Sequence, residues 1–334
     1  MDIFIEPEFT EYYRKNPIVL VDIGASGGLE PNWQPAKKYL QIIGFEPDVR
    51  EFSNLEEKAN REGNNIKYIN TGLYKNKTSI DFFLTAKQQT SSIFKPNRKL
   101  IDKFPEKERF DIIKTVKINT DSLDNQFEAH NINDADFIKI DTQGSELFIL
   151  EGAEETIRNN IFGLEIEVEF VELYKDQPLF AEVDSYVRKQ GFQLFDIQGG
   201  YWKREIGKSY GKKKGQLMFG NALYFKKTED FVKVIDGIQD KYAKKTKVLK
   251  AVSICLLYGY IDYALELFYM ISDVFDKHER KIIEKMIKRN VRYESKIPHF
   301  KGKHLIASIF CYFYEVWKPT HDRWATVDRK LGNL

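Results

Sequence analysis

Short apolar segments alternate with amphipathic segments along the first two thirds of the chain. The apolar runs at 18–21 and 40–45 are typical of parallel strands that are buried on both faces. The same pattern predicts further strands at 66–70, 79–84, 115–118, 136–141, 162–170, 192–197 and 222–225, and helices at 121–130, 145–158 and 181–190. Strands that alternate with helices indicate a doubly wound, mostly parallel sheet, which is an α/β fold.

Beyond Lys227 the pattern changes to long helical periodicity. It predicts helices around 231–242, 248–258, 261–275, 280–291 and 305–317. The chain therefore divides into an α/β domain at 1–227 and an all-helical extension at 228–334. The roles that we consider for this extension are a cap, a homo-oligomer contact and a partner-binding surface. Truncation after Lys227 would test whether it is dispensable.

The first strand ends in an acid and a glycine-rich turn, Asp22-Ile23-Gly24-Ala25-Ser26-Gly27-Gly28. Glycines let the backbone of such a turn approach a ligand closely. Asp22 would repel the pyrophosphate of a dinucleotide, whereas it would attract the ammonium and sulfonium of S-adenosylmethionine. Ser26 also stands where the dinucleotide fingerprint requires a second glycine. The turn therefore predicts S-adenosylmethionine as the cofactor, with an ordinary α/β turn as the alternative.

The second strand ends in another acid, in the sequence Phe45-Glu46-Pro47. A carboxylate roughly 20 residues beyond a glycine turn accepts hydrogen bonds from ribose hydroxyls in nucleotide-binding α/β folds. The alternative is that Glu46 caps the helix that begins near Val49, helped by Pro47 and Asp48. Because both motifs stand in register, we favour the cofactor role.

Composition narrows the class of protein. The chain has 334 residues, and its net charge of +2 argues against a nucleic-acid binder that relies on bulk positive charge. Residues 1–13 lack the basic start and apolar core of a signal peptide, and no apolar run has the length of a transmembrane helix. Cys255 and Cys311 are far apart, so neither a disulfide framework nor a zinc site is indicated. We expect a cytoplasmic protein.

Four segments carry a family resemblance: VDIGASGG at 21–28, GFEPD at 44–48, DFIKIDTQGSELFILEGA at 136–153 and LEIEVEFVELYKDQPLF at 164–180. Together they resemble the FkbM family of S-adenosylmethionine-dependent methyltransferases, from about Ile18 to Phe225. The resemblance implies a Rossmann-like class I methyltransferase core and O-methylation of hydroxyls on sugars or secondary metabolites. The expected cofactor-binding residues are Asp22, Gly24, Ala25, Ser26, Gly28, Glu46, Pro47, Asp141 and Gln143. Asn221 departs from the family, because related sequences often carry Asp there.

Three glutamates alternate along the strand that follows Asp141. Glu165, Glu167 and Glu169 therefore project to one face of the predicted sheet. Asp141, Glu167 and Glu169 lie nearest the carboxyl ends of the strands, and we expect them to bind the acceptor or act as general base. A divalent metal shared by Asp141 and Glu169 is an open alternative. Another is that the strand is exposed on one face or pairs with lysines, which weighs most for Glu165.

The acceptor class follows by elimination. The Asp-Thr-Gln-Gly turn at 141–144 lacks the Asn-Pro-Pro-Tyr-like pattern of amino-group methylation of bases, and neither cysteine stands near it. The segment 88–92 offers amides and hydroxyls for a sugar or for the methionine carboxylate, or is an ordinary turn. Basic residues within 203–214 could attract an acidic glycan, but a solvated loop is favoured. Tyr174, Tyr201 and Trp202 could stack on sugars, although packing is the commoner role.

We therefore interpret the sequence as an S-adenosylmethionine-dependent O-methyltransferase that acts on a sugar hydroxyl of a surface polysaccharide or glycoconjugate. One rival is a non-catalytic scaffold subunit of a glycan-assembly complex. The other is a nicotinamide-dependent oxidoreductase on the same fold, against which Asp22 and the glycine spacing count.

Overall fold

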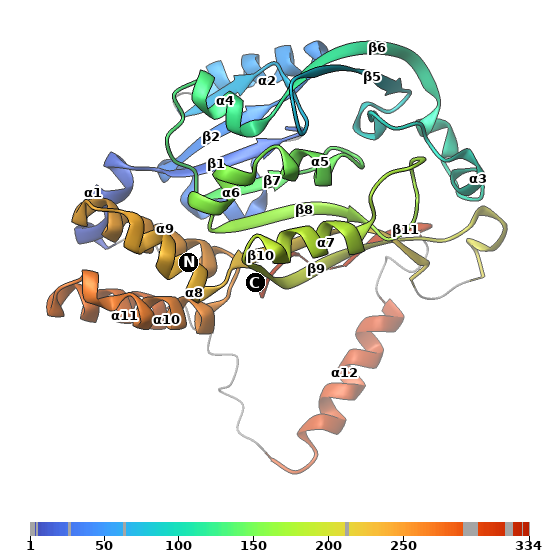
Figure 1. Cartoon of the computed structure of the whole chain (residues 1–334). Coiled ribbons are helices and arrows are strands. Elements are labelled where there is room, and N and C mark those ends of the chain that lie inside the picture. Colours follow the sequence, from blue (N-terminus) through green and yellow to red (C-terminus); the bar gives the residue numbers. More distant parts are fainter. Residues whose placement is uncertain are drawn as a thin grey trace.

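An eight-stranded sheet forms the centre of the molecule (Figure 1). The computed structural model describes residues 4, 6–25, 28–62, 65–210, 214–289, 300–317, 323–328 and 330–333. The sheet has the order β11-β9-β10-β8-β7-β1-β2-β3. Its strands are β1 (Ile18–Ile23), β2 (Leu40–Phe45), β3 (Ile66–Ile69), β7 (Phe137–Ile140), β8 (Gly163–Glu169), β9 (Phe192–Trp202), β10 (Gln216–Lys226) and β11 (Ala325–Val327). Strands β3, β2, β1, β7 and β8 are parallel, and β10 runs antiparallel to β8 and β9. The predicted α/β fold with a mostly parallel sheet is confirmed.

The strands predicted at 79–84 and 115–118 do not join this sheet. They lie in β5 (Thr78–Thr85) and β6 (Ile112–Asp121), which pair antiparallel and form a separate sheet with β4 (Gly72–Leu73) in the order β4-β6-β5. Much of β5 and β6 is exposed on alternate residues, which is typical of an antiparallel sheet with one face in water. This small sheet stands above the upper end of the central sheet in Figure 1.

One face of the central sheet is covered by four short helices, α4 (Leu123–Ala129), α5 (Glu146–Glu151), α6 (Glu154–Asn159) and α7 (Phe180–Lys189). The side chain of Ser122 caps α4, as its position before an apolar run predicts. The single helix predicted at 145–158 is wrong, because the chain breaks at Gly152 into α5 and α6. A Cβ atom at Gly152 would lie 2.3 Å from the carbonyl oxygen of Tyr74, so the break lets two backbones approach closely.

The other face is covered by helices from both ends of the chain. They are α1 (Pro7–Lys15), the 3-10 helix η1 (Pro31–Tyr39), α8 (Thr228–Gly237), α9 (Lys241–Leu257), α10 (Ile261–Met270) and α11 (Lys277–Arg289). One hydrophobic core joins Leu20, Phe137 and Phe225 of the sheet to Val252 and Leu256 of α9. The helices beyond Lys227 therefore form part of the second layer that the sheet needs on this face.

Helix α9 is anchored to the sheet by a buried ion-pair network. Lys247 Nζ lies 2.8 Å from Asp136 Oδ1 and 2.6 Å from Asp134 Oδ1, and Lys250 Nζ lies 2.9 Å from Asp136 Oδ2. Asp136 Oδ2 also accepts a hydrogen bond of 2.8 Å from the backbone N–H of Val19 in β1. Burial alone would raise the pKa of Asp136, but the two ammonium groups hold it below its ordinary value. The network ties α9 to the starts of β1 and β7.

The rest of the extension leaves this layer. Helix α12 (Lys303–Trp317) stands below the body in Figure 1, and β11 then pairs antiparallel with β9 at the edge of the sheet. The extension is thus helical as predicted except for β11, which the apolar pattern did not predict. No helix in the described part of the chain is long and apolar enough to cross a membrane. The remaining elements are α2 (Val49–Glu62), α3 (Arg98–Ile101), η2 (Gln88–Thr90), η3 (Lys107–Phe110), η4 (Glu205–Gly207) and η5 (Ser272–Val274).

Candidate active site

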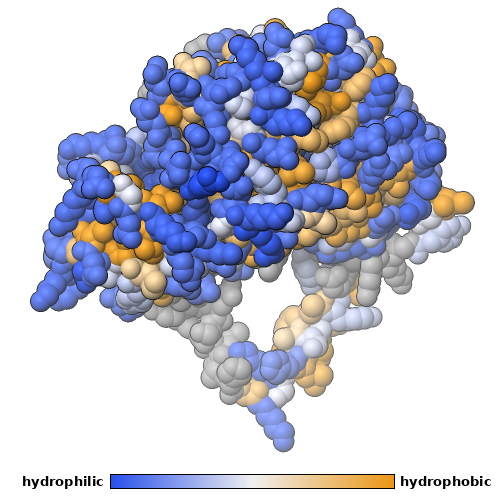
Figure 2. Space-filling model, in the orientation of Figure 1, coloured by the Kyte–Doolittle hydropathy of each residue, from blue (hydrophilic) through white to orange (hydrophobic). Residues whose placement is uncertain are grey.

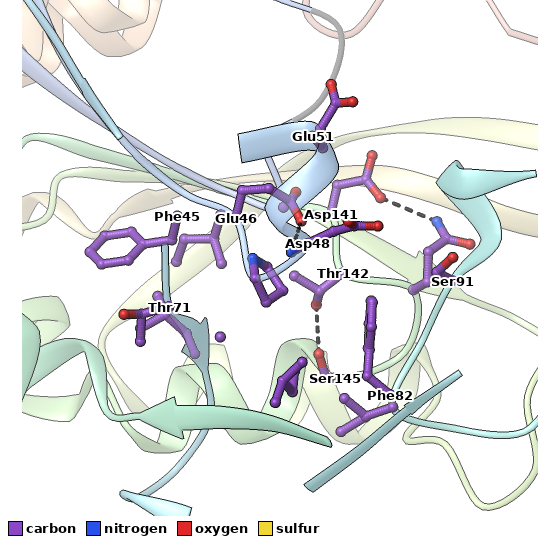
Figure 3. A pocket seen from close by; sticks show the side chains of 18 of the residues that line it. Phe45, Glu46, Asp48, Glu51, Thr71, Phe82, Ser91, Asp141, Thr142 and Ser145 are labelled. Carbon is purple, nitrogen blue, oxygen red and sulfur yellow. Dashed lines mark hydrogen bonds between the residues drawn. The ribbon is translucent and has the colours of Figure 1, made fainter. Parts of the chain in front are cut away.

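A cavity of about 360 Å³ opens at the carboxyl ends of β1, β2 and β7 (Figure 3). Gly24, Glu46 and Asp141 lie on the side of the central sheet, and the small sheet of β4, β5 and β6 forms the opposite wall. The volume is that of a small-molecule pocket, and the place is where open α/β sheets bind ligands.

The wall formed by the small sheet is apolar. The small sheet contributes Leu73, Ile80, Phe82 and Ile118 to the lining, and Phe45 at the end of β2 contributes from the central sheet. A flat heterocycle such as adenine fits a slot of this kind. Sequence reasoning missed these residues, although the alternation of Ile80 with Phe82 is a signal that one face of β5 is buried.

The polar part of the cavity is acidic. Glu46, Asp48, Glu51 and Asp141 line it, and Lys58 is the only basic side chain among its described lining residues. Even without Glu46, whose pKa burial raises to about 8, the described lining carries more acidic than basic side chains, which favours a cationic ligand over a pyrophosphate. The sulfonium and ammonium of S-adenosylmethionine therefore suit this cavity better than the pyrophosphate of a nicotinamide dinucleotide does.

Glu46 stands at the end of β2 with its side chain in the cavity (Figure 3). Its Oε1 atom accepts a hydrogen bond of 2.8 Å from the backbone N–H of Asp48, while Asp48 in turn accepts from the N–H of Arg50 at the start of α2. Burial raises the pKa of Glu46 to about 8, and the neighbouring carboxylates of Asp48 and Glu51 add to this effect. Asp48 thus serves the helix start, and Glu46 remains a cavity residue beside Pro47.

The glycine turn meets the turn after β7 at close range. Gly24 has a φ of +78°, and a Cβ atom there would lie 2.0 Å from the carbonyl oxygen of Asp141. The backbone N–H of Asp141 donates to the carbonyl oxygen of Ile23 over 3.0 Å. Only glycine satisfies both the positive φ and the close approach, so Gly24 brings the two cofactor motifs together.

Other predicted residues of the glycine turn lie elsewhere. Asp22 and Gly28 line a second cavity of about 920 Å³ between η1 and α2, Ala25 is buried, and Ser26 lies outside the described residues. Asp22 Oδ1 has no hydrogen-bond partner in the described part of the chain, and Lys139 Nζ is 3.8 Å away. Burial raises the pKa of Asp22 even beside this ammonium. A direct contact of these residues with the cofactor stays a prediction.

The turn at 141–144 is held by a glutamate whose role sequence reasoning missed. Glu146 Oε1 accepts hydrogen bonds from the backbone N–H and the hydroxyl of Thr142, each over 2.9 Å, and from the N–H of Gly144 over 3.2 Å. Gln143 in this turn has a φ of +60°, a conformation that costs a non-glycine residue free energy and persists where surrounding contacts enforce it. Glu146 is one of those contacts.

Gln143 connects three groups. Its Nε2 atom donates to Asp141 Oδ1 over 3.2 Å and to Glu167 Oε2, and its Oε1 atom accepts from the hydroxyl of Tyr174 over 2.8 Å. Tyr174 is fully buried, so it is not free to stack on a sugar. The amide of Gln143 therefore orients both predicted catalytic acids, Asp141 and Glu167.

The predicted catalytic acids occupy different positions. Asp141 lines the cavity, whereas Glu167 and Glu169 are not among its lining residues and lie behind it on β8. Burial, followed by the charges of Asp141 and Glu169, raises the pKa of Glu167 well above its ordinary value. Burial and the charges of Glu146 and Asp141 do the same for Glu169. Both carboxyl groups therefore hold their protons more strongly than an ordinary glutamate does.

The third alternating glutamate is structural. Glu165 is buried, and its Oε2 atom accepts a hydrogen bond of 2.8 Å from the hydroxyl of Tyr258 at the end of α9. Trp33 Nε1 donates to the same hydroxyl over 3.2 Å. Burial raises the pKa of Glu165 to about 7. Glu165 thus helps to attach α9 and η1 to the sheet.

The structure describes several residues for which the sequence left alternatives open. Within the segment 88–92, Gln88, Gln89 and Ser91 line the cavity, and Ser92 Oγ donates to the carbonyl oxygen of Gln143 over 2.7 Å. Asn221 lies beside Glu167 on β10 and donates to Gln198 Oε1 over 3.4 Å. Trp202 is buried among aromatic rings, and Tyr201 donates to Asp328. The described residues contain no group of three or more His, Cys, Asp or Glu side chains that could hold a metal ion.

Comparisons with known proteins agree with this arrangement. A family model of the methyltransferase FkbM domain matches residues 22–194, which includes the glycine turn, Glu46, the turn at 141–144 and all of β8. None of the curated proteins matches the chain.

Solved methyltransferase structures are similar at low levels. They include an FkbM methyltransferase from Methylobacillus flagellatus, with 20% identity, a TM-score of 0.38 and coverage of 63% of this chain. This chain spans 43% of that protein. A precorrin-6y C5,15-methyltransferase from Geobacter metallireducens has 10% identity and a TM-score of 0.33, over 65% of this chain and 87% of that one. A magnesium protoporphyrin IX methyltransferase from Synechocystis has 7% identity and a TM-score of 0.34, over 66% and 77%. At these identities and TM-scores, none of the three structures indicates a substrate for this chain.

Proposed function

The chain belongs to the FkbM methyltransferase family, and from that premise we propose that it transfers a methyl group from S-adenosylmethionine to a hydroxyl group of a sugar. The observation that carries the proposal is the acidic cavity at the ends of β1, β2 and β7, with Asp141 in its lining and Gln143 beside it. When bound, S-adenosylmethionine would supply an electrophilic methyl group: the acceptor oxygen would bond to the methyl carbon as the carbon–sulfur bond breaks and S-adenosylhomocysteine leaves.

The cavity offers a partner for each part of this cofactor. The apolar slot between Phe45 and Phe82 suits the adenine, and Glu46 is placed to accept hydrogen bonds from the ribose hydroxyls. Gly24 leaves the backbone at the end of β1 accessible. The amides of Gln88 and Gln89 on the opposite wall suit the methionine carboxylate or the acceptor.

Asp141 is the group that we assign as general base. A hydroxyl must lose its proton when its oxygen bonds to carbon, and of the predicted catalytic acids Asp141, Glu167 and Glu169, only Asp141 is among the described residues that line the cavity. Gln143 donates to Oδ1 of Asp141 and so fixes the orientation of the carboxylate. Burial and the neighbouring charges raise the pKa of Glu167, so Glu167 is a poorer candidate for a base that must be ionised before it accepts a proton.

A cofactor titration tests the first half of the proposal. Calorimetry with S-adenosylhomocysteine should show binding to the native protein, and Glu46→Gln should weaken it by roughly tenfold or more through the lost ribose contacts. Glu56→Gln, on the exposed side of α2, is the matched control and should bind like the native protein. Absence of binding to the native protein would reject the enzyme and favour the scaffold subunit.

The pH dependence sharpens this test. Because ribose hydroxyls donate to the ionised form of Glu46, and its pKa in the free protein is about 8, binding should release a proton below that pH. The affinity should therefore increase as the pH rises towards about 8 and then level off, and Glu46→Gln should remove this slope. A slope that survives in Glu46→Gln would assign the titration to another group.

Methyl transfer tests the second half. Asp141→Asn should bind S-adenosylhomocysteine within about threefold of the native protein and lose roughly 10²–10⁴-fold in methylation rate. The probe is transfer of a labelled methyl group to a panel of nucleotide sugars and free sugars. If the protein binds the cofactor and methylates amines but not sugars, the proposed sugar acceptor is wrong, while the proposed methyltransferase activity is retained.

A further inference from the structure

Helix α12 exposes large apolar side chains. All of its described side chains except Lys303 are exposed, and the exposed fraction reaches 81% for Trp317, 71% for Phe310 and 67% for Leu305. Figure 2 shows apolar residues on the surface of this helix below the body of the molecule. A patch of this size on a stable protein is a contact surface.

The apolar residues of α12 share one side of the helix. Spacings of three and four residues place eight of them on an arc of roughly 160° around the helix axis. These eight are Leu305, Ile306, Ile309, Phe310, Tyr312, Phe313, Val316 and Trp317. The opposite side carries His304, Ala307, Ser308 and Cys311, and Tyr314 lies between the two sides. The helix is therefore amphipathic, and the described part of the chain leaves its apolar side exposed.

The shape of this side argues against a helical partner. A helix that pairs with another helix presents a narrow seam of Leu, Ile or Val, with charged residues alternating beside it. On α12 the arc is wider, and half of the eight residues are aromatic: Phe310, Tyr312, Phe313 and Trp317. Aromatic side chains are enriched where protein meets the boundary between lipid headgroups and acyl chains.

Basic residues flank the helix. Lys301 and Lys303 stand at its start, and Lys318 and Arg323 follow its end in the sequence, while Glu315 is the one acid within it. Basic residues on both sides of an apolar helix in the sequence complement the phosphates of an anionic bilayer surface. With 15 residues, the helix is roughly 22 Å long, which is shorter than the hydrocarbon core of about 30 Å, so it would lie along the surface.

The geometry points to α12 as an interfacial helix that docks this protein on an anionic lipid bilayer. The apolar arc enters the headgroup boundary, and the flanking lysines contact lipid phosphates. This inference goes beyond methyl transfer and needs no cofactor for its test. Its failure would leave the proposed reaction intact.

Vesicle sedimentation with the full chain tests the proposal. The probe is vesicles of phosphatidylcholine with about one quarter phosphatidylglycerol. The native protein should sediment with them, and Ile309→Gln with Phe313→Gln should lower the partition coefficient by roughly tenfold or more. The matched control, Ala307→Gln with Ser308→Gln on the opposite side, should stay within about threefold of the native protein. Melting temperatures of both variants establish that they are folded.

Charge is tested separately. Lys301→Gln with Lys303→Gln should weaken binding to the anionic vesicles, and high salt should do the same. Suppose that Ile309→Gln with Phe313→Gln binds the vesicles as strongly as Ala307→Gln with Ser308→Gln does. That result would overturn the assignment of membrane binding to the apolar arc. The native protein could instead self-associate without binding vesicles, and Ile309→Gln with Phe313→Gln could abolish that self-association. This result would overturn the proposed membrane docking and make α12 a contact between two copies of the chain.

Discussion

Helices α9 and α12 belong to the same C-terminal extension and are both rich in apolar residues, but they have opposite environments. Every side chain from Thr246 to Leu257 of α9 is buried, including those of Lys247 and Lys250. In α12 the described side chains are exposed apart from Lys303. Apolar content alone does not distinguish the two helices.

The buried charges explain the difference. Lys247 and Lys250 reach Asp136, which stands at the start of β7 on the face that α9 covers. A buried carboxylate is costly without such partners, so the sheet and α9 require each other. Within the described residues, helix α12 shows no buried ion pair and no element that covers its apolar side.

Truncation has the largest expected effect. A chain of residues 1–227 would expose the core that Leu20, Phe137 and Phe225 share with α9, so it should show no cooperative thermal unfolding. A chain of residues 1–289 keeps α8–α11 and should still unfold cooperatively in circular dichroism. Cooperative unfolding of 1–227 would contradict the shared core. If 1–227 does not fold, truncation after Lys227 cannot show whether the extension is dispensable for function.

Replacement of Asp136, whose carboxylate pairs with Lys247 and Lys250, has the second largest expected effect. Asp136→Asn leaves two buried lysines with the half-exposed Asp134 as partner, and should lower the free energy of unfolding by about 3–5 kcal/mol. Asp134→Asn is the matched control, with an expected loss of about 1 kcal/mol. Chemical denaturation measures both. Equal losses would mean that burial of Asp136 adds nothing.

The buried ion pairs of Asp136 also predict how the free energy of unfolding depends on pH. The folded pKa of Asp136 lies below its ordinary value of 3.8, so its contribution is fully present above that pH and is lost as the pH falls through the folded pKa. Asp136→Asn should therefore flatten the acid side of the stability profile. An unchanged acid side would assign acid unfolding to other carboxylates.

The smallest effect is expected in α12. Ile309→Gln with Phe313→Gln should change the free energy of unfolding by less than about 0.5 kcal/mol, because exposed side chains contribute little to stability. Denaturant unfolding without vesicles measures this. A loss of several kcal/mol would show that α12 is packed against the body in solution.

The parallel strands and their acids were predictable because each depends on a local pattern. Glu46 and Asp141 follow apolar runs, and parallel strands bring their carboxyl ends to one edge. The division of 145–158 into two helices was not predictable, since at the break Gly152 packs against the carbonyl group of Tyr74, which is distant in the sequence. The small sheet was also missed, because strand periodicity does not state which sheet a strand joins.

The sequence by itself determined the α/β alternation, the glycine turn and the acids at the strand ends, since periodicity of two or 3.6 residues and glycine at a tight turn are local properties. Only the tertiary structure decided that Asp141 lines the cavity while Glu167 does not and has a raised pKa, and that α9 is buried while α12 is exposed. Protonation and burial depend on which distant groups come within a few ångströms, and that information is absent from the pattern along the chain.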